Sequence, residues 1–165
     1  MIKTFNVIDS PYELGLRALL ILLHEESISM TCERILFYDY YATYNLDIVS
    51  SDKTVTVLPP YPHRKVELYN KKRLMEDGLK YYTLKQIISV HINDKGVYYS
   101  SNVNSIWLGT AFSNDIFAQK YIKALDQCSP ILRAKTDKEI MIESSYNSEK
   151  KVSSDVILQY YEGGE

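Results

Sequence analysis

The feature that most constrains the fold is a pair of consecutive helical segments that are apolar around most of their circumference. The first runs from Pro11 to His24: Ser10 can cap it, Pro11 suits the first helical position, and Glu13 completes a Ser-x-x-Glu capping box. Its apolar side chains form two adjoining stripes along the helix. Much of this segment must therefore be buried.

The second segment, residues 32–46, begins after Ser29 or Thr31, either of which can cap it. Residues 35–42 are apolar or aromatic on nearly every side except at Asp39. Such a helix must be covered on more than one face, by the rest of the chain or by a partner. A carboxylate in these surroundings needs a cation or several hydrogen bonds. We therefore expect a structural ion pair of Asp39 with Arg17 or with another arginine.

The remaining pattern predicts a proline-containing loop at 47–62, with a short strand at 54–58, and then a helix that begins after Pro62 and runs to about Lys85. Two β-rich runs at 87–92 and 97–100 flank a glycine-containing turn, which indicates a β-hairpin. Helices follow at 104–112 and 113–128, and the latter should end before Pro130. The polar sequence after residue 133 contains a predicted strand at 140–143 and a mixed segment at 156–161.

This order of elements predicts an α+β, mostly helical chain. The closest architecture is a winged helix-turn-helix-like domain over residues 1–133, with three helices, a β-hairpin wing and a C-terminal helix. Residues 134–165 are expected to form a polar C-terminal tail. The pattern alone leaves other small α+β folds open.

Motifs for catalysis or ligand binding are absent from the sequence. It has no Gly-x-x-x-x-Gly-Lys loop, His-Glu-x-x-His pair, Gly-x-Ser-x-Gly elbow or Cys-x-x-Cys pair. We therefore expect no enzyme activity, no cofactor and no metal. The longest strongly apolar run, residues 18–23, is far shorter than the roughly 20 residues that span a membrane. Two isolated cysteines suit reduced, buried thiols, so a cytoplasmic protein is expected.

Charge is distributed unevenly along the chain. Residues 1–62 carry four basic and eight acidic side chains, whereas residues 63–85 carry seven basic and three acidic ones, a net charge of +4. The third helix of a winged helix is the one that can enter the DNA major groove. An ordinary solvated helix face is the alternative. The candidate DNA-contacting residues are Arg64, Lys65, Lys71, Lys72, Arg73, Lys80 and Lys85.

Tyrosine is unusually frequent, with fifteen residues against four phenylalanines and one tryptophan. Tyrosine suits protein interfaces because its ring buries well while its hydroxyl tolerates water. Adjacent tyrosines on one helix are not expected all to face one core, so some should contact a partner. The candidate partner-binding residues are Tyr38, Tyr40, Tyr41, Tyr44, Tyr69, Tyr81 and Tyr82.

Four sequence segments, in their order along the chain, resemble those of a known protein family. They are SPYELGLRALL at residues 10–20, RILFYDYY at 34–41, PHR at 62–64 and RLMEDGL at 73–79. The chain resembles the middle component of ABC-three-component systems, a family that includes the small accessory subunit of Lamassu-type anti-phage defence complexes. The predicted hairpin falls where the wing of that family falls. Residues 84–86, Leu-Lys-Gln, stand where the family usually has a small residue and a glycine.

The resemblance implies a non-catalytic accessory subunit that sits between an SMC-like ATPase and an effector such as a nuclease. ATP hydrolysis and DNA cleavage would belong to those partners, and this subunit could touch DNA within the complex. An autonomous winged-helix transcriptional regulator, acting through the basic helix, is the alternative. A third hypothesis is an enzyme without a recognisable motif. Its only candidate catalytic centre is Asp39 with Arg17 or Tyr40.

Overall fold

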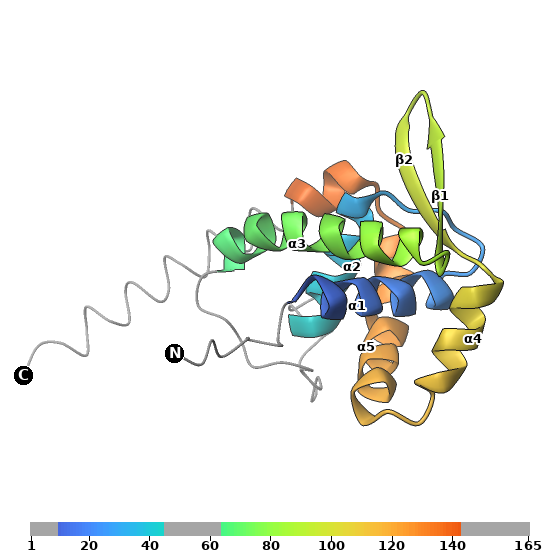
Figure 1. The fold of residues 1–165 in the computed structure, drawn as a ribbon. Coiled ribbons are helices and arrows are strands. Elements are labelled where there is room, and N and C mark those ends of the chain that lie inside the picture. Colours follow the sequence, from blue (N-terminus) through green and yellow to red (C-terminus); the bar gives the residue numbers. More distant parts are fainter. Residues whose placement is uncertain (1–9, 45–63, 143–165) are drawn as a thin grey trace, which may run out of the picture.

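The computed structural model describes residues 10–44 and 64–142, which form a mostly helical structure with one projecting two-stranded hairpin (Figure 1). The α+β, mostly helical class predicted from the sequence is confirmed. Residues 137–142 are also helical. The labelled elements, in chain order, are α1 (Pro11–His24), α2 (Cys32–Tyr44), α3 (Arg64–Leu84), β1 (Ile88–Asn93), β2 (Gly96–Ser101), α4 (Val103–Ala111) and α5 (Ile116–Arg133).

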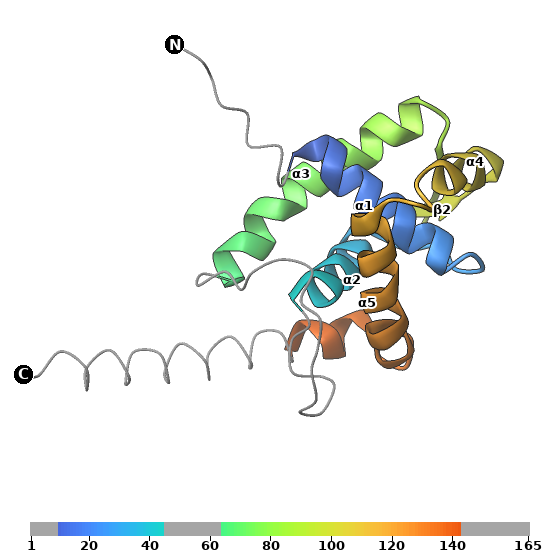
Figure 2. The same ribbon diagram turned by 90° about the horizontal axis from the view of Figure 1, so that it is seen from below.

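Helix α2 is the central element of the described fold. It contacts α1, α3, α5 and strand β2, which lie on different sides of it (Figures 1 and 2). Its residues from Ile35 to Tyr44 are all buried. The nearly all-round apolar sequence of this helix is therefore explained by cover from the chain's own elements, and no partner is needed to account for it.

Helices α1 and α3 cross in close contact at two glycines. A Cβ atom added to Gly78 would lie against the carbonyl oxygen of Pro11 and 2.8 Å from the backbone nitrogen of Gly15. A Cβ atom on Gly15 would lie 2.5 Å from the ring of Tyr82. Gly78 therefore marks close helix packing, and α3 continues through it without a break.

The hairpin is anchored to the helical body by the segment that joins α1 and α2. Strands β1 and β2 pair in continuous antiparallel register from Ile88–Ser101 to Asn93–Gly96. Met30 forms an isolated bridge with Tyr99 on the outer side of β2: Met30 N–H donates to Tyr99 O at 2.9 Å, and Tyr99 N–H donates to Met30 O at 2.8 Å. The base of the hairpin is thereby fixed, while its tip projects away from the helices (Figure 1).

The exit from α3 uses a left-handed residue that is not glycine. Gln86 has φ 59°, and the N–H of Ile87 donates to Tyr82 O, as in a Schellman cap. The side chains of Asn102 and Asn104 both donate to the carbonyl oxygen of Gln86, at 3.2 and 2.8 Å. These bonds hold a conformation that costs a non-glycine residue about 1–2 kcal/mol.

Two predictions from the sequence are wrong, one about the end of a helix and one about a strand. Helix α5 does not end before Pro130 but includes it and runs to Arg133, because buried Leu132 and the contacts of Arg133 hold the last turn in place. The predicted strand at 140–143 is wrong for residues 140–142, which are helical and place Ile140 in the core. Residue 143, the loop at 47–62, the strand at 54–58 and the segment at 156–161 lie outside the described residues.

Candidate protein-interaction surfaces

A buried polar cluster joins α1, α2 and α5. Arg17 is 0% exposed and Asp39 is 1% exposed, and Arg17 Nε lies 3.2 Å from Asp39 Oδ1. Tyr121 donates its hydroxyl to the same carboxylate oxygen at 2.6 Å, and Arg17 donates to Thr43 Oγ1 at 3.5 Å. Burial, followed by the nearby Asp39 charge, raises the pKa of Tyr121 well above its usual value. The cluster is enclosed, so its role is to join the three helices.

The four tyrosines of α2 lie in the core. Tyr38, Tyr40, Tyr41 and Tyr44 are between 1% and 6% exposed. Tyr40 packs edge-on against Tyr41 and Tyr44, with ring centroids 5.9 and 5.5 Å apart. The structure thus places these four candidate partner-binding rings inside the domain. The side chain of Tyr69 lies outside the described part of the chain.

Of the other two candidate tyrosines, Tyr81 is exposed and Tyr82 is half-buried against the core, and both contact Tyr12, which was not a candidate from the sequence. Tyr12 is 60% exposed and packs edge-on against Tyr81 at 4.9 Å, while Tyr82 donates to the carbonyl oxygen of Tyr12 at 3.2 Å. Lys85 Nζ lies 5.8 Å from the Tyr81 ring centroid. This aromatic corner, Tyr12, Tyr81 and Tyr82, is a candidate contact surface.

The basic residues in and just after α3 differ in their burial and in their contacts. Lys71 is buried and donates to the hydroxyl of Tyr44 at 3.2 Å, and Lys72 pairs with Glu33 at 2.8 Å. The hydrogen bond from Lys72 lowers the pKa of Glu33. Arg73, Lys80 and Lys85 are exposed. The side chains of Arg64 and Lys65 lie outside the described residues. Thus α3 does not present its described cations as one basic face.

A groove of about 640 Å³ lies between α3, the start of α2 and the hairpin. Its lining combines apolar hairpin residues with two acidic and two basic side chains. Burial and the nearby Glu76 and Glu33 charges raise the pKa of Cys32 to about 12, so this thiol stays protonated and unreactive. The lining residues are Thr31, Cys32, Glu33, Glu76, Lys80, Thr83, Leu84, Val90, Lys95, Gly96, Val97 and Tyr99.

The hairpin is amphipathic. Residues paired across an antiparallel ladder share a face, so Val90 and Ile92 lie on the same face as Val97 and Tyr99. Val90 and Val97 line the groove, and Val90, Ile92 and Val97 are 40%, 77% and 43% exposed. The opposite face is polar, with His91 hydrogen-bonded to Ser100 at 3.0 Å. The apolar face is therefore open to a partner.

Helix α4 presents a second apolar surface. Val103, Ile106 and Trp107 are 76%, 53% and 74% exposed and share one face at i, i+3 and i+4. No residue of α4 carries a charge. Asn102 caps the helix in a capping box with Ser105. An exposed stripe with a tryptophan and no charge has the composition of an interface centre.

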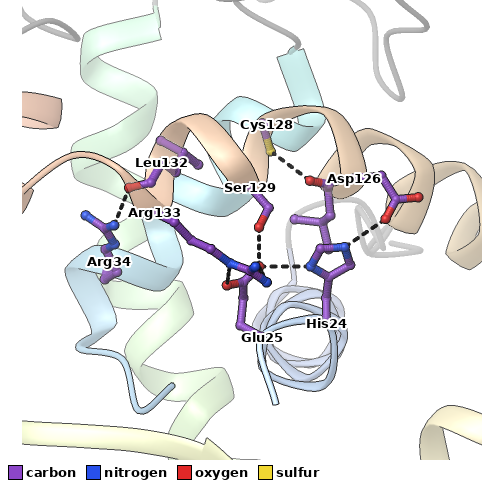
Figure 3. A network of polar contacts seen from close by, with 9 residues as sticks. His24, Glu25, Arg34, Asp126, Cys128, Ser129, Leu132 and Arg133 are labelled. Carbon is purple, nitrogen blue, oxygen red and sulfur yellow. Dashed lines mark hydrogen bonds and ion pairs between the residues drawn. The ribbon is translucent and has the colours of Figure 1, made fainter. Parts of the chain in front are cut away.

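A polar network fixes the end of α1 to α5 (Figure 3). Glu25 is 1% exposed, accepts from Arg133 Nε at 2.5 Å and from Ser129, and contacts His24 Nδ1 at 2.9 Å. His24 Nε2 in turn lies 2.9 Å from Asp126. Burial would raise the pKa of Glu25, but its hydrogen bonds to Arg133, Ser129 and His24 outweigh that effect and lower it. Glu25 could not be singled out from the sequence, because a glutamate after a helix end normally faces water.

Glu25→Gln is expected to lower the free energy of unfolding by about 1–2 kcal/mol at neutral pH, since a charge-assisted bond becomes a neutral one. Because folding lowers the pKa of Glu25, its contribution is full above the ordinary glutamate pKa and is lost as the pH falls through the folded value. The variant should therefore lose less stability on acidification than the parent. Urea unfolding at several pH values measures this, with Asp126→Asn at the exposed rim as control.

No described helix is long and apolar enough to cross a membrane. No group of three or more histidine, cysteine, aspartate or glutamate side chains in the described ranges could hold a metal ion.

The chain matches a known protein family over most of its length. The family model described as ABC-three component (ABC-3C) system Middle Component 2 matches residues 7–154, which is most of the chain. No curated protein and no solved structure matches the chain. The matched range includes all the described residues, and therefore the groove, the aromatic corner and the α4 stripe.

Proposed function

The chain belongs to the family of middle component 2 of ABC-three-component systems, and from that premise we propose that it is a non-catalytic adaptor of an anti-phage defence complex of the Lamassu type. It holds an SMC-like ATPase and an effector, such as a nuclease, in one assembly. ATP hydrolysis and DNA cleavage belong to those two components. The adaptor domain is a winged helix, which α1–α3, the Met30 bridge and the following hairpin support.

The observation that carries this proposal is the apolar character of the surfaces that a DNA-binding winged helix would make basic. A wing that contacts DNA needs cations aimed at phosphates. The described hairpin offers Lys95 but exposes Val90, Ile92 and Val97 on its groove face. Exposed apolar patches of this kind mark protein–protein contact sites.

The rival function, an autonomous DNA-binding regulator, is favoured by one observation: Arg73 and Lys80 are exposed on α3, and Lys85 is exposed directly after it. Glu76 and Asp77 are exposed on the same helix and reduce its positive potential. If those three cations each neutralise a phosphate, log K should fall with log salt at a slope of about −2.7. Tight binding of the isolated chain to duplex DNA with such a slope would favour the regulator over the adaptor.

Trp107→Ala is the variant that tests the adaptor surface. Exposed tryptophans at interface centres typically contribute 2 kcal/mol or more to binding, so the affinity for at least one companion component should fall by roughly 30-fold. The measurement is co-purification after co-expression with the ATPase and the effector, followed by titration. Ile122→Ala removes an exposed apolar side chain from α5 and serves as control. If Trp107→Ala recovered both companions as well as the unaltered chain does, α4 would not be part of the interface.

A further inference from the structure

Strand β1 is an edge strand in the described part of the chain. The sheet there contains β1 and β2, and the outer side of β2 is bridged to Met30. The outer side of β1 has no strand beside it among the described residues. Its backbone therefore offers a free edge on the projecting part of the molecule (Figure 1).

The direction of the free backbone groups follows from the register. Tyr99 uses both its N–H and its C=O to bond Met30, so these groups point away from β1. Val90 is the partner of Tyr99 across the ladder, and residues in such a non-hydrogen-bonded pair both point their backbone groups outward. Because the pattern alternates, Ile92 does the same. The N–H and C=O groups of Val90 and Ile92 thus point out from the β1 edge.

This edge lacks the features by which proteins usually protect one. Edge strands are commonly blunted by charged side chains, proline or a bulge. Strand β1, with the sequence ISVHIN, contains no charged residue and no proline, and its pairing with β2 has no bulge. Val90 and Ile92 are 40% and 77% exposed on the apolar face. Backbone groups and apolar side chains are therefore presented together at the same positions.

We propose that the free edge of β1 receives an extended segment of a companion protein, which adds as a third strand to the hairpin. The segment has apolar side chains at alternate positions, and these extend the apolar face of Val90, Ile92 and Val97. Main-chain hydrogen bonds supply affinity and the alternating side chains supply specificity, as in other strand additions. This inference rests on the proposed adaptor function, in which the companion is the ATPase or the effector.

The size of the edge selects a companion segment over a second copy of the chain. Strand β1 has six residues, and pairing two such strands would bury far less than the roughly 1,000 Å² expected of a stable interface. A segment that belongs to a protein already held at another surface gains effective concentration from that second contact. The α4 stripe and the aromatic corner, Tyr12, Tyr81 and Tyr82, are available for that contact.

The test compares two substitutions at one position. Ile92→Pro removes the outward N–H together with the isoleucine side chain, and proline is tolerated on an edge strand where the N–H faces solvent. Ile92→Thr also removes much of the apolar side chain but keeps the N–H. We expect Ile92→Pro to bind the companion at least tenfold more weakly than Ile92→Thr, measured by titration with the purified ATPase and the purified effector. Equal affinities of the two variants would overturn strand addition.

Hydrogen exchange gives a second readout that does not depend on a variant folding. The amides of Val90 and Ile92 should exchange quickly in the chain alone and become protected when the companion binds. A complex that forms without this protection would overturn the inference and leave the adaptor function standing. Failure of the unaltered chain to bind either companion would overturn both. If these amides instead became protected as the concentration of the chain alone increased, the edge would pair with a second copy of the chain, and the proposal of a companion segment would be overturned.

Discussion

Asp39→Ala is expected to lower the free energy of unfolding by about 3–5 kcal/mol, the usual cost of breaking a buried ion pair by removing one partner. Arg17 is fully buried, and its Nε lies 3.2 Å from the Asp39 carboxylate. The substitution also removes the acceptor of the Tyr121 hydroxyl. Three helices lose their shared polar contact at once, so the effect should be large.

Urea unfolding followed by circular dichroism measures this change. Asp137→Ala is the matched control, because Asp137 pairs with Arg34 at 2.8 Å but is 53% exposed, and such surface pairs contribute at most about 1 kcal/mol. Asp39→Asn keeps an oxygen for Tyr121 but loses the charge and should fall between the two. If Asp39→Ala cost no more than the control, the cluster would not hold the helices together.

Gly78→Ala should be the second most damaging single change. The added methyl group would meet backbone atoms of Pro11 and Gly15, which cannot rotate away, so α1 and α3 must move apart. Overpacking of this kind costs about 1–3 kcal/mol, and the unyielding backbone places this site at the upper end. Alanine recovers about 1 kcal/mol through its higher helix propensity. The expected net loss is about 2 kcal/mol.

Gly109→Ala provides the comparison for Gly78→Ala. Its added methyl group would meet Leu23 Cδ1, the far end of a flexible side chain, so the gain in helix propensity should make the variant neutral or slightly more stable. Thermal unfolding of both variants measures the contrast. A stabilised Gly78→Ala would show that the two helices do not pack at the distance described.

The α+β class, the hairpin and most helix positions could be predicted from the sequence, because they depend on local signals. The Ser10 cap, Pro11 and the alternating strands with Gly96 act within a few residues of themselves. The end of α5 could not be predicted in this way. Pro130 disfavours a helix locally, but buried Leu132 and the Arg133–Glu25 ion pair hold the chain helical beyond it.

The candidate surfaces were less predictable, because burial of a side chain depends on what the rest of the chain places around it. The residue types of Tyr38 and Lys71 favour contacts with a partner or with DNA. In the structure, Tyr38 lies in the core and Lys71 is buried against Tyr44. Exposure likewise selects Tyr12 and Trp107, which no sequence pattern had singled out as partner-binding residues. Helix periodicity shows that a face is apolar, but it does not show what covers that face.

The proposed bridging role can be tested most directly by expressing the ATPase and the effector together, with and without this chain, and measuring whether the effector co-purifies with a tagged ATPase. The adaptor account predicts a complex of all three proteins when the chain is present and loss of the effector when it is omitted. The result that would contradict the account is equal recovery of the effector on the ATPase in both preparations.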